Sequence, residues 1–216
     1  KGEVYLASPE TAAASAVAGL ITTADRIPGQ PAVFPTGNRR AAGAAREAAP
    51  QGERKPTRLR GRVWVVDRDN VDTDMIFHNR YLAITDKAEM AKCTFDNLEG
   101  FRDFARQARP GDIVVTSRNF GAGSSRQQAV DCFLALGVQA LVARSFGAIY
   151  ERNAINAGLP ILTADLIGSG IENGEEIEVD LATGRIVRLA SGAVVQAEPF
   201  SPIQMEIYQK GGLLAL

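Results

Sequence analysis

A glycine-rich loop that carries two serines and an arginine, residues 119–126, lies between a strand pattern and a helix pattern. The residues before it, 112–117, read Asp-Ile-Val-Val-Thr-Ser, which is typical of a buried strand. After it, apolar residues recur at helical spacing over residues 129–136. Gly121 and Gly123 allow the tight turn that joins the two elements. This strand–loop–helix unit restricts the chain to folds in which strands and helices alternate.

The same alternation extends over residues 59–165 and predicts an α/β domain. Such connections favour parallel pairing, so we expect a mostly parallel central sheet with helices on its faces. Further strands are expected at residues 62–66, 139–143 and 160–163, and helices at 85–91, 98–108, 145–157 and 203–209. A C-terminal β-hairpin is expected at residues 176–189. Ligands bind beyond the carboxyl ends of parallel strands, where the loop 119–126 would lie.

Ser124, Ser125 and Arg126 are the candidate binding residues of this loop. A serine at the start of a helix faces unpaired N–H groups and the positive end of the helix dipole. Such a place binds a carboxylate or phosphate and stabilises an ionised oxygen on the serine itself. Alternatively, Ser124 or Ser125 is only the N-cap of the helix. A dinucleotide fingerprint would need its third glycine at Arg126, and a Walker A loop would need Gly-Lys-Ser/Thr, so neither motif is present.

A second polar cluster lies upstream, at residues 72–81. Asp72, Thr73 and Asp74 follow the strand expected at 62–66, and His78, Arg80 and Tyr81 come next. Each has an ordinary structural interpretation: the aspartates as turn formers, the arginine as a solvated charge and the histidine as a packed side chain. The cluster gains interest because the loop 119–126 is expected at the same edge of the sheet.

Composition sets limits on the partners. The chain has 216 residues and a formal net charge of −1, which does not favour nucleic acid or membrane partners. No run of about 18 apolar residues predicts a spanning helix, and the N-terminus lacks the apolar core of a signal peptide. Two cysteines, without a metal or redox pattern, favour a reducing cytoplasm. With a single histidine besides, we expect no metal site on this chain.

Two segments precede the α/β domain. Residues 1–27 contain an alanine-rich helix that starts with Ser8 as N-cap and Pro9 at the first helical position, and it is expected to end near Thr22. A lone helix of this size is marginal in water and needs a larger surface to dock on. Residues 28–58 are rich in proline, glycine, alanine and arginine without apolar periodicity, which predicts a linker.

Several motifs occur together in one order. They are N-V-D-T-D-M-I with R-Y-L, R-P-G-D-I-V-V followed by N-F-G-A-G-S-S-R, S-F-x-x-I-Y-x-R-N-A-I-N-x-G-L-P, E-V-D-L-A-T-G-R-I and the final G-G-L-L. Through them residues 60–216 resemble the small, swivelling β/β/α domain of the aconitase superfamily of hydro-lyases. The resemblance is closest to the small subunits of isopropylmalate isomerase and homoaconitase.

The resemblance implies dehydration and rehydration of a hydroxy di- or tricarboxylic acid. In this family a [4Fe–4S] cluster, held by three cysteines of a large part, binds the substrate hydroxyl through an open iron. Position matching makes Ser124 the base that removes the proton α to a carboxylate. The same matching implies that Ser125 and Arg126 bind a substrate carboxylate and that Asp74 and Thr73 line the site. Arg80 would bind a second carboxylate of the substrate.

The resemblance also implies a domain organisation for the chain. Residues 4–19 are similar to the last residues of the family's large catalytic portion. We therefore expect residues 1–27 to be the end of such a portion, 28–58 the interdomain linker and 59–216 the swivelling domain of a fused chain. A large iron–sulfur-bearing domain or subunit is the expected partner, and the 216-residue chain alone should be inactive.

The chain departs from the family pattern at positions near the site. Gln127-Gln128 replaces an acid–histidine pair after S-S-R, and Ala148 replaces an arginine after S-F. The loop that resembles the family's specificity loop reads Tyr81-Leu82-Ala83-Ile84. Because Ala83 and Ile84 cannot pair with a charge, we expect a substrate with an apolar γ-substituent, such as 3-isopropylmalate or an alkyl malate. His78 replaces a more usual small residue, which complicates this expectation.

Three alternatives stay open. Within the same class, the substrate is an aconitate, methylcitrate or homoaconitate type of acid. In a different class, the fold serves as a non-catalytic RNA-binding or regulatory module. A third is an unrelated anion-binding α/β domain, against which the number and order of the motifs argue.

Overall fold

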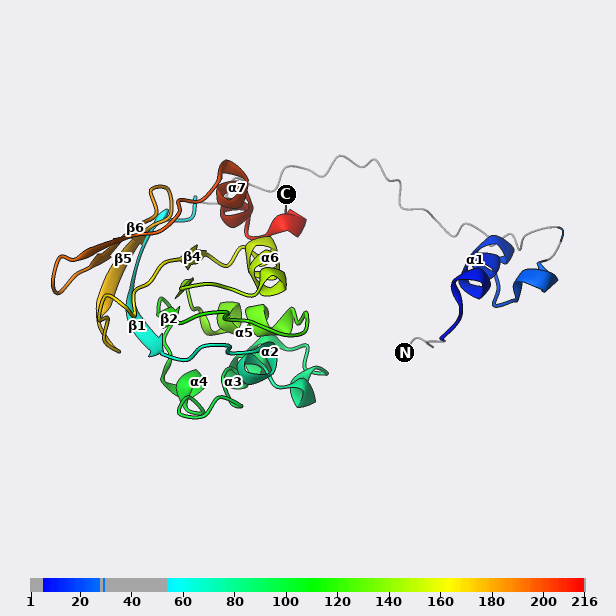
Figure 1. Cartoon of the computed structure of the whole chain (residues 1–216), viewed down its shortest axis with the longest axis horizontal. Helices are drawn as coiled ribbons and strands as arrows, with labels where there is room; N and C mark the ends of the chain where they lie inside the picture. Colours follow the sequence, from blue (N-terminus) through cyan, green and yellow to red (C-terminus); the bar gives the residue numbers. More distant parts are fainter. Residues whose placement is uncertain (1–5, 28, 30–53, 216) are drawn as a thin grey trace. The chain divides into compact units, whose positions relative to one another are not determined.

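The computed structural model describes residues 6–27, 29 and 54–215, and the chain divides between residues 52 and 53 into two compact units (Figure 1). Most of the predicted linker 28–58, namely residues 28 and 30–53, lies outside the described residues, and its last residue, Arg58, already belongs to the first strand. The first unit contains helix α1 (Pro9–Ala18) and the 3₁₀ turn η1 (Ala24–Arg26). The Ser8 hydroxyl accepts a hydrogen bond from the Thr11 N–H at 3.3 Å, so the predicted cap is confirmed.

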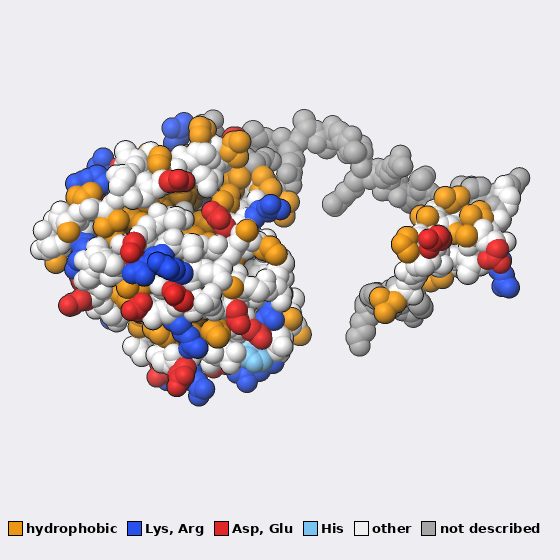
Figure 2. Space-filling view, in the orientation of Figure 1, with side chains coloured by type: hydrophobic (Ala, Val, Ile, Leu, Met, Phe, Trp, Pro, Cys, Tyr) orange, Lys and Arg blue, Asp and Glu red, His pale blue; other side chains and the backbone are white. Residues whose placement is uncertain are grey.

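The predicted end of α1 near Thr22 is wrong. Gly19 adopts φ 72° and closes the helix, with its N–H bonded to the Ser15 carbonyl at 2.9 Å. Within the first unit several large apolar side chains are exposed: Leu6, Val17, Leu20, Ile21 and Ile27. Figure 2 shows hydrophobic side chains on the visible face of this unit.

The second unit is built on a seven-stranded sheet in the order β4-β3-β2-β1-β5-β6-β7. The strands are β1 (Arg58–Val66), β2 (Ile113–Thr116), β3 (Ala140–Ala143), β4 (Ile161–Thr163), β5 (Glu176–Asp180), β6 (Arg185–Arg188) and β7 (Val194–Gln196). Strands β1 to β4 pair in parallel, and β5 to β7 continue the sheet as antiparallel strands. The α/β class, the parallel central sheet and the C-terminal hairpin are confirmed.

Strand β1 joins the two halves of the sheet. Its first half, residues 58–62, pairs antiparallel with β5, and its second half, residues 63–66, pairs in parallel with β2. Side chains alternate between the faces of a strand. Accordingly, Val114 of β2 packs in one core, whereas Ile113 and Val115 pack in the other. Burial on both faces explains why β2 reads as an unbroken apolar run.

The helices of the second unit are α2 (Thr73–Ile76), α3 (Lys87–Lys92), α4 (Phe104–Gln107), α5 (Gln128–Leu136), α6 (Ala148–Ala157) and α7 (Pro202–Lys210), with 3₁₀ turns η2 (Asn79–Tyr81) and η3 (Leu213–Ala215). Figure 1 shows α2 to α6 gathered on one side of the parallel strands. Their apolar faces form the first core. The second core contains residues of β5, β6 and α7.

Two helix predictions need correction. The helix expected over residues 98–108 is confined to α4, because the segment before it turns around the buried Phe95 instead of continuing as a helix. Ser145 does not cap α6: the N-cap position is Gly147, and the Ser145 hydroxyl instead accepts a hydrogen bond from the Asn119 N–H at 2.9 Å. In both places a contact distant in sequence overrides the local pattern.

Phe95 is the centre of the aromatic part of the first core. Its ring contacts four other phenylalanine rings at centroid distances of 5.0 to 6.3 Å: Phe101, Phe104, Phe120 and Phe133. Most of these pairs are edge-to-face, the geometry that aromatic quadrupoles favour. The cluster therefore fixes the chain on both sides of α4 and below the loop 119–126.

Among the helices of the described residues, none has both the length and the apolar character needed to cross a bilayer.

Gly121 offers a test of how tightly the first core fits under this loop. A Cβ at Gly121 would overlap the ring of Tyr150 on α6, whereas a Cβ at Gly170 would meet nothing within 4 Å. The two glycines have almost the same φ, 76° and 75°. Gly170→Ala should therefore cost about 1 kcal/mol of unfolding free energy, and Gly121→Ala about 1–3 kcal/mol more. Denaturant unfolding measures both, and equal losses would contradict the close fit.

Candidate active site

Backbone hydrogen bonds join the loop after β1 to the loop after β2. The Gly121 N–H donates to the Val71 carbonyl at 2.7 Å, and the Thr73 N–H donates to the Ala122 carbonyl at 2.9 Å. The buried Thr73 hydroxyl donates to the Ser124 carbonyl at 3.0 Å. These bonds bring the two predicted polar clusters together beyond the carboxyl ends of the parallel strands, as expected for this class of sheet.

Asp72 and Asp74 have different roles, although they lie close in sequence. The Asp72 carboxylate accepts the N–H groups of Asp74 and Met75 at 2.9 and 2.8 Å, so Asp72 is the N-cap of α2. The Asp74 carboxylate instead accepts a hydrogen bond from the Arg126 guanidinium and one from the Asn79 N–H at 2.9 Å. The structural interpretation therefore holds for Asp72 alone.

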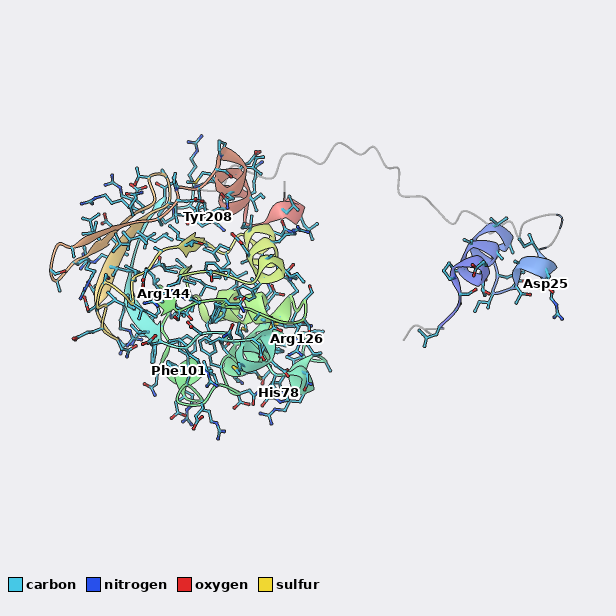
Figure 3. All side chains as sticks on the ribbon, in the orientation of Figure 1. Asp25, His78, Phe101, Arg126, Arg144 and Tyr208 are labelled. Carbon is cyan, nitrogen blue, oxygen red and sulfur yellow. The ribbon has the colours of Figure 1, made fainter. Side chains whose placement is uncertain are left out.

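Arg126 is held in a fixed orientation. Its Nη1 donates to the Asp74 carboxylate and to the Phe77 carbonyl, the latter at 3.2 Å, and only 14% of its side chain is exposed. Figure 3 labels Arg126. The hydrogen bond from Arg126 lowers the pKa of Asp74, against a smaller opposing effect of burial. Asp74 is therefore a carboxylate at neutral pH and a permanent partner for the arginine.

The expectation that Ser124 stands at a helix start is wrong. Helix α5 begins at Gln128, its N-cap position is Gln127, and no side chain caps it. The Ser124 carbonyl accepts the Thr73 hydroxyl, and the first bonds of the helix run from Ala129 and Val130 to the carbonyls of Arg126 and Gln127. Ser124 and Ser125 thus lie in an exposed loop before the helix, and neither caps it.

The loop nevertheless presents donors for an anion. Among the described residues, no acceptor is hydrogen-bonded to the backbone N–H groups of Ser124, Ser125, Arg126 or Gln127. Successive open N–H groups of this kind form an anion-binding concavity without needing a regular helix start. The Ser125 hydroxyl accepts a hydrogen bond from Asn153 of α6 at 3.3 Å.

Arg80 and Tyr81 belong to a second set of contacts, centred on Asp96. Arg80 Nη2 donates to Asp96 Oδ2 at 2.6 Å, and the Tyr81 hydroxyl donates to the same oxygen at 2.5 Å. The guanidinium lies over the Tyr81 ring at 4.7 Å. The hydrogen bond to Asp96 raises the pKa of Tyr81, and the Tyr81 hydroxyl lowers the pKa of Asp96. None of these contacts includes Ser124 or Arg126.

The remaining residues of the predicted specificity loop differ in burial. Leu82 and Ala83 are exposed, whereas Ile84 is half-buried against the first core. His78 caps the turn η2, because its Nδ1 accepts a hydrogen bond from the Arg80 N–H at 3.1 Å. Figure 2 shows the histidine at the molecular surface. A structural role thus accounts for its contacts.

The sequence predictions missed three supporting residues. They are Asn79, whose N–H bonds to Asp74, Asp96, which binds Arg80 and Tyr81, and Asn153, which binds Ser125. Asn153 lies inside the R-N-A-I-N motif, which was a usable signal. Asn79 acts through its backbone, and Asp96 lies in a turn sequence without a motif. The sequence therefore contained no signal for either residue.

The residues that the structure describes contain no group of three or more His, Cys, Asp or Glu placed to hold a metal ion. Cys93 and Cys132 are free, and burial raises the pKa of the Cys132 thiol to about 12. A thiol of this kind is a poor metal ligand, because ligation requires the thiolate. The described residues therefore do not fit an iron–sulfur cluster.

Comparisons with known proteins agree with this architecture. Residues 84–165 match the family model of the aconitase C-terminal domain. The 3-isopropylmalate dehydratase small subunit of Aquifex aeolicus is 45% identical over 158 residues, which cover 73% of this chain and 93% of the relative. The methanogen homoaconitase small subunit of Methanothermobacter thermautotrophicus is 44% identical over 157 residues, covering 72% and 88%. A crystal structure of 3-isopropylmalate dehydratase from Methanocaldococcus jannaschii aligns with a TM-score of 0.68 at 35% identity, covering 73% and 92%.

The Asp74–Arg126 pair predicts a pH-dependent contribution to stability. Because the pKa of Asp74 is lowered in the folded state, its contribution is fully present above the unfolded pKa of about 3.9. The contribution is lost as the pH falls through the folded value. Asp74→Asn should therefore lower the unfolding free energy near neutral pH by up to about 1 kcal/mol, since both side chains are partly exposed.

Urea unfolding of the wild type and Asp74→Asn at about pH 6 and about pH 3 measures this difference. The difference in unfolding free energy between the two proteins should be smaller at the lower pH. Arg126→Gln should remove the same acid-dependent step, because it removes the partner of the carboxylate. A gap between wild type and Asp74→Asn that is independent of pH would contradict the assignment.

Proposed function

The chain belongs to the family of 3-isopropylmalate dehydratase and homoaconitase small subunits, and we propose that it contributes the proton-abstracting half of an active site for 3-isopropylmalate or a related alkyl malate. Members of this family are the small subunits of hydro-lyases. The observation that carries the proposal is the loop 119–126, in which the exposed Ser124 lies beside open backbone N–H groups and the fixed Arg126.

In this proposal Ser124 is the base that removes the proton α to a substrate carboxylate. A serine needs a strongly lowered pKa for this task, so positive groups must lie around its oxygen. Helix α5 starts too late to provide them at Ser124, and the open N–H groups of the loop take over that role. No hydrogen bond joins the Ser124 hydroxyl to another described residue, which leaves it accessible to a substrate.

Ser125 and Arg126 would hold the substrate carboxylate. A guanidinium has five N–H donors, and the contacts to Asp74 and Phe77 both use Nη1, so other donors remain for a ligand. Asp74 then acts by fixing the arginine. Thr73 would act by fixing the Ser124 backbone, because its buried hydroxyl is already bonded there.

Arg80 is our candidate for a second substrate carboxylate. Only one of its N–H groups is bonded to Asp96, and its side chain is more than half exposed. Its guanidinium lies 4.7 Å from the centre of the Tyr81 ring, and the exposure of the side chain makes it accessible to a ligand. The same loop continues into Leu82, Ala83 and Ile84, which we assign to the non-reacting substituent of the substrate.

Our assignment of that substituent is based on the residues of the specificity loop and not on overall sequence identity to the relatives. Three relatives, named for isopropylmalate, for homoaconitate and for isopropylmalate or citramalate, are 45%, 44% and 40% identical to this chain. The exposed Leu82 and Ala83 offer no charge to an extra carboxylate, which is costly to leave unpaired. This favours an apolar γ-substituent. A homoaconitate-type acid is the second candidate, supported by the 44% identical relative of that name.

We propose that a large aconitase-type partner, or a fused large domain, carries a [4Fe–4S] cluster. When bound there, the cluster supplies a Lewis acid for the substrate hydroxyl. The capped helix α1, with Leu20 and Ile21 exposed, supports our assignment of residues 1–27 to the end of such a large portion. The two free cysteines fit a reducing cytoplasm, where we place the enzyme.

Ser124→Ala tests the base directly. In enzyme reconstituted from this chain and an iron–sulfur-loaded large part, the substitution should lower kcat for 3-isopropylmalate by at least about 100-fold. Ser125→Ala keeps the backbone N–H and should have a smaller effect. The absorbance change on dehydration measures both. Undiminished turnover by Ser124→Ala would refute the assignment, and turnover of citrate by the wild type in place of 3-isopropylmalate would refute the substrate.

Ala83→Arg tests the specificity loop. An arginine at this exposed position should pair with an additional carboxylate, so kcat/KM for a homoaconitate-type substrate should rise by about tenfold relative to 3-isopropylmalate. Ala88→Arg, at an exposed position of α3, is the matched control for added charge. An equal shift in both variants would mean that the loop does not read the substituent.

A further inference from the structure

Phe95 has an unusual backbone conformation. Its φ is 61°, and its side chain is completely buried. The other non-glycine residues with positive φ among the described residues are Asn70 and Asn119, and asparagine enters this region readily. A bulky aromatic residue does so only where the surrounding structure compels it, and such residues concentrate at functional sites.

The surroundings of Phe95 compel this conformation from two directions. The four phenylalanine rings of the first core hold its side chain, and its N–H donates to the Ile76 carbonyl at 2.9 Å. Side chain and backbone are therefore both fixed. The left-handed turn then directs the next residues, Asp96 and Asn97, back toward the segment 74–81.

Residues 95–97, which we call the brace, contact that segment at several points. The Phe95 N–H binds the Ile76 carbonyl, and Asn97 Nδ2 donates to the Asp74 carbonyl at 3.3 Å. Asp96 Oδ2 accepts hydrogen bonds from Arg80 at 2.6 Å and from the Tyr81 hydroxyl at 2.5 Å. The brace thus spans the segment from the partner of Arg126 to the start of the specificity loop.

From these contacts we infer that Asp96 is a positioning residue for substrate binding, which fixes Arg80 and Tyr81 and through them the specificity loop Tyr81–Ile84. The inference rests on the proposed function, because it gives Asp96 a role in recognising that substrate. Asp96 does not itself touch the substrate in this scheme. Its effect should therefore appear in KM more than in kcat.

The shared oxygen explains why a carboxylate is suited to this place. A single Asp96 oxygen accepts one charged and one neutral donor, so the guanidinium is held close to the phenol ring, at 4.7 Å from its centre. Arg80 is more than half exposed and would otherwise sample many rotamers. Without the carboxylate, both side chains regain that freedom, and binding must order them again.

The first test uses reconstituted enzyme. Asp96→Asn should raise KM for 3-isopropylmalate about tenfold while kcat changes less than about twofold. Tyr81→Phe should raise KM in the same direction, and the double variant should show less than the product of the two effects, because both substitutions remove the same contact. Asp103→Asn, an exposed aspartate paired with Arg106 on the neighbouring helix, is the matched control and should change neither constant.

An unchanged KM in Asp96→Asn, or a loss of kcat at constant KM, would overturn the positioning role. Equal changes in Asp96→Asn and Asp103→Asn would overturn it as well, because they would show a general effect of lost charge.

The second test needs no activity. Amide hydrogen exchange of the full chain should become faster over residues 79–84 in Asp96→Asn and stay at the wild-type rate in Asp103→Asn. Unchanged exchange over this segment would overturn the brace itself. If the exchange result holds but wild-type reconstituted enzyme does not turn over 3-isopropylmalate, then the proposed function has failed while the brace stands as structure, and the assignment to substrate binding is withdrawn.

Discussion

The hydrogen bonds between the loops after β1 and β2 are the constraint on which the candidate site depends. The parallel pairing of these strands ends where Val66 meets Thr116, and it resumes beyond as the isolated bridge between Asp72 and Ala122. The two loops are equally long, so the register of the sheet carries into the site. The positions of Thr73 and of the loop 119–126 are therefore set by the sheet and not by the conformational preferences of the loops. For this reason a glycine-rich segment can hold functional groups in fixed positions.

Both candidate arginines are oriented by aspartates of the same chain. Asp74 holds Arg126, and Asp96 holds Arg80. Each pair leaves part of the guanidinium free, so the entropy of ordering a long side chain is lost during folding and not during substrate binding. The arrangement also lowers the net positive charge that an empty site would carry. Because these carboxylates lie in the chain itself, the arginines are ordered before any partner or substrate arrives.

Much of this architecture was predictable from the sequence, and the two failures around the loop 119–126 have a common cause. Apolar runs at 113–116 and 140–143 identified the buried strands, and the motifs identified both polar loops. The start of α5 was not predictable, since the Thr73 hydroxyl takes the Ser124 carbonyl from a distant segment. Ser145 likewise binds Asn119 instead of capping α6. In each case a long-range contact won over a local preference that differs by only about 1 kcal/mol.

The two hydrophobic cores of the second unit lie on opposite faces of the sheet, and only one of them supports the candidate site. The supports of the candidate site, including Val71, Phe77, Phe95, Phe120 and Tyr150, belong to the first core. The antiparallel strands and α7 contribute to the second, on the other side of the sheet. The second core contains none of these supports, and it buries the opposite face of the sheet. Substitutions around the loops can therefore change chemistry while the sheet, anchored on both faces, keeps the register that places them.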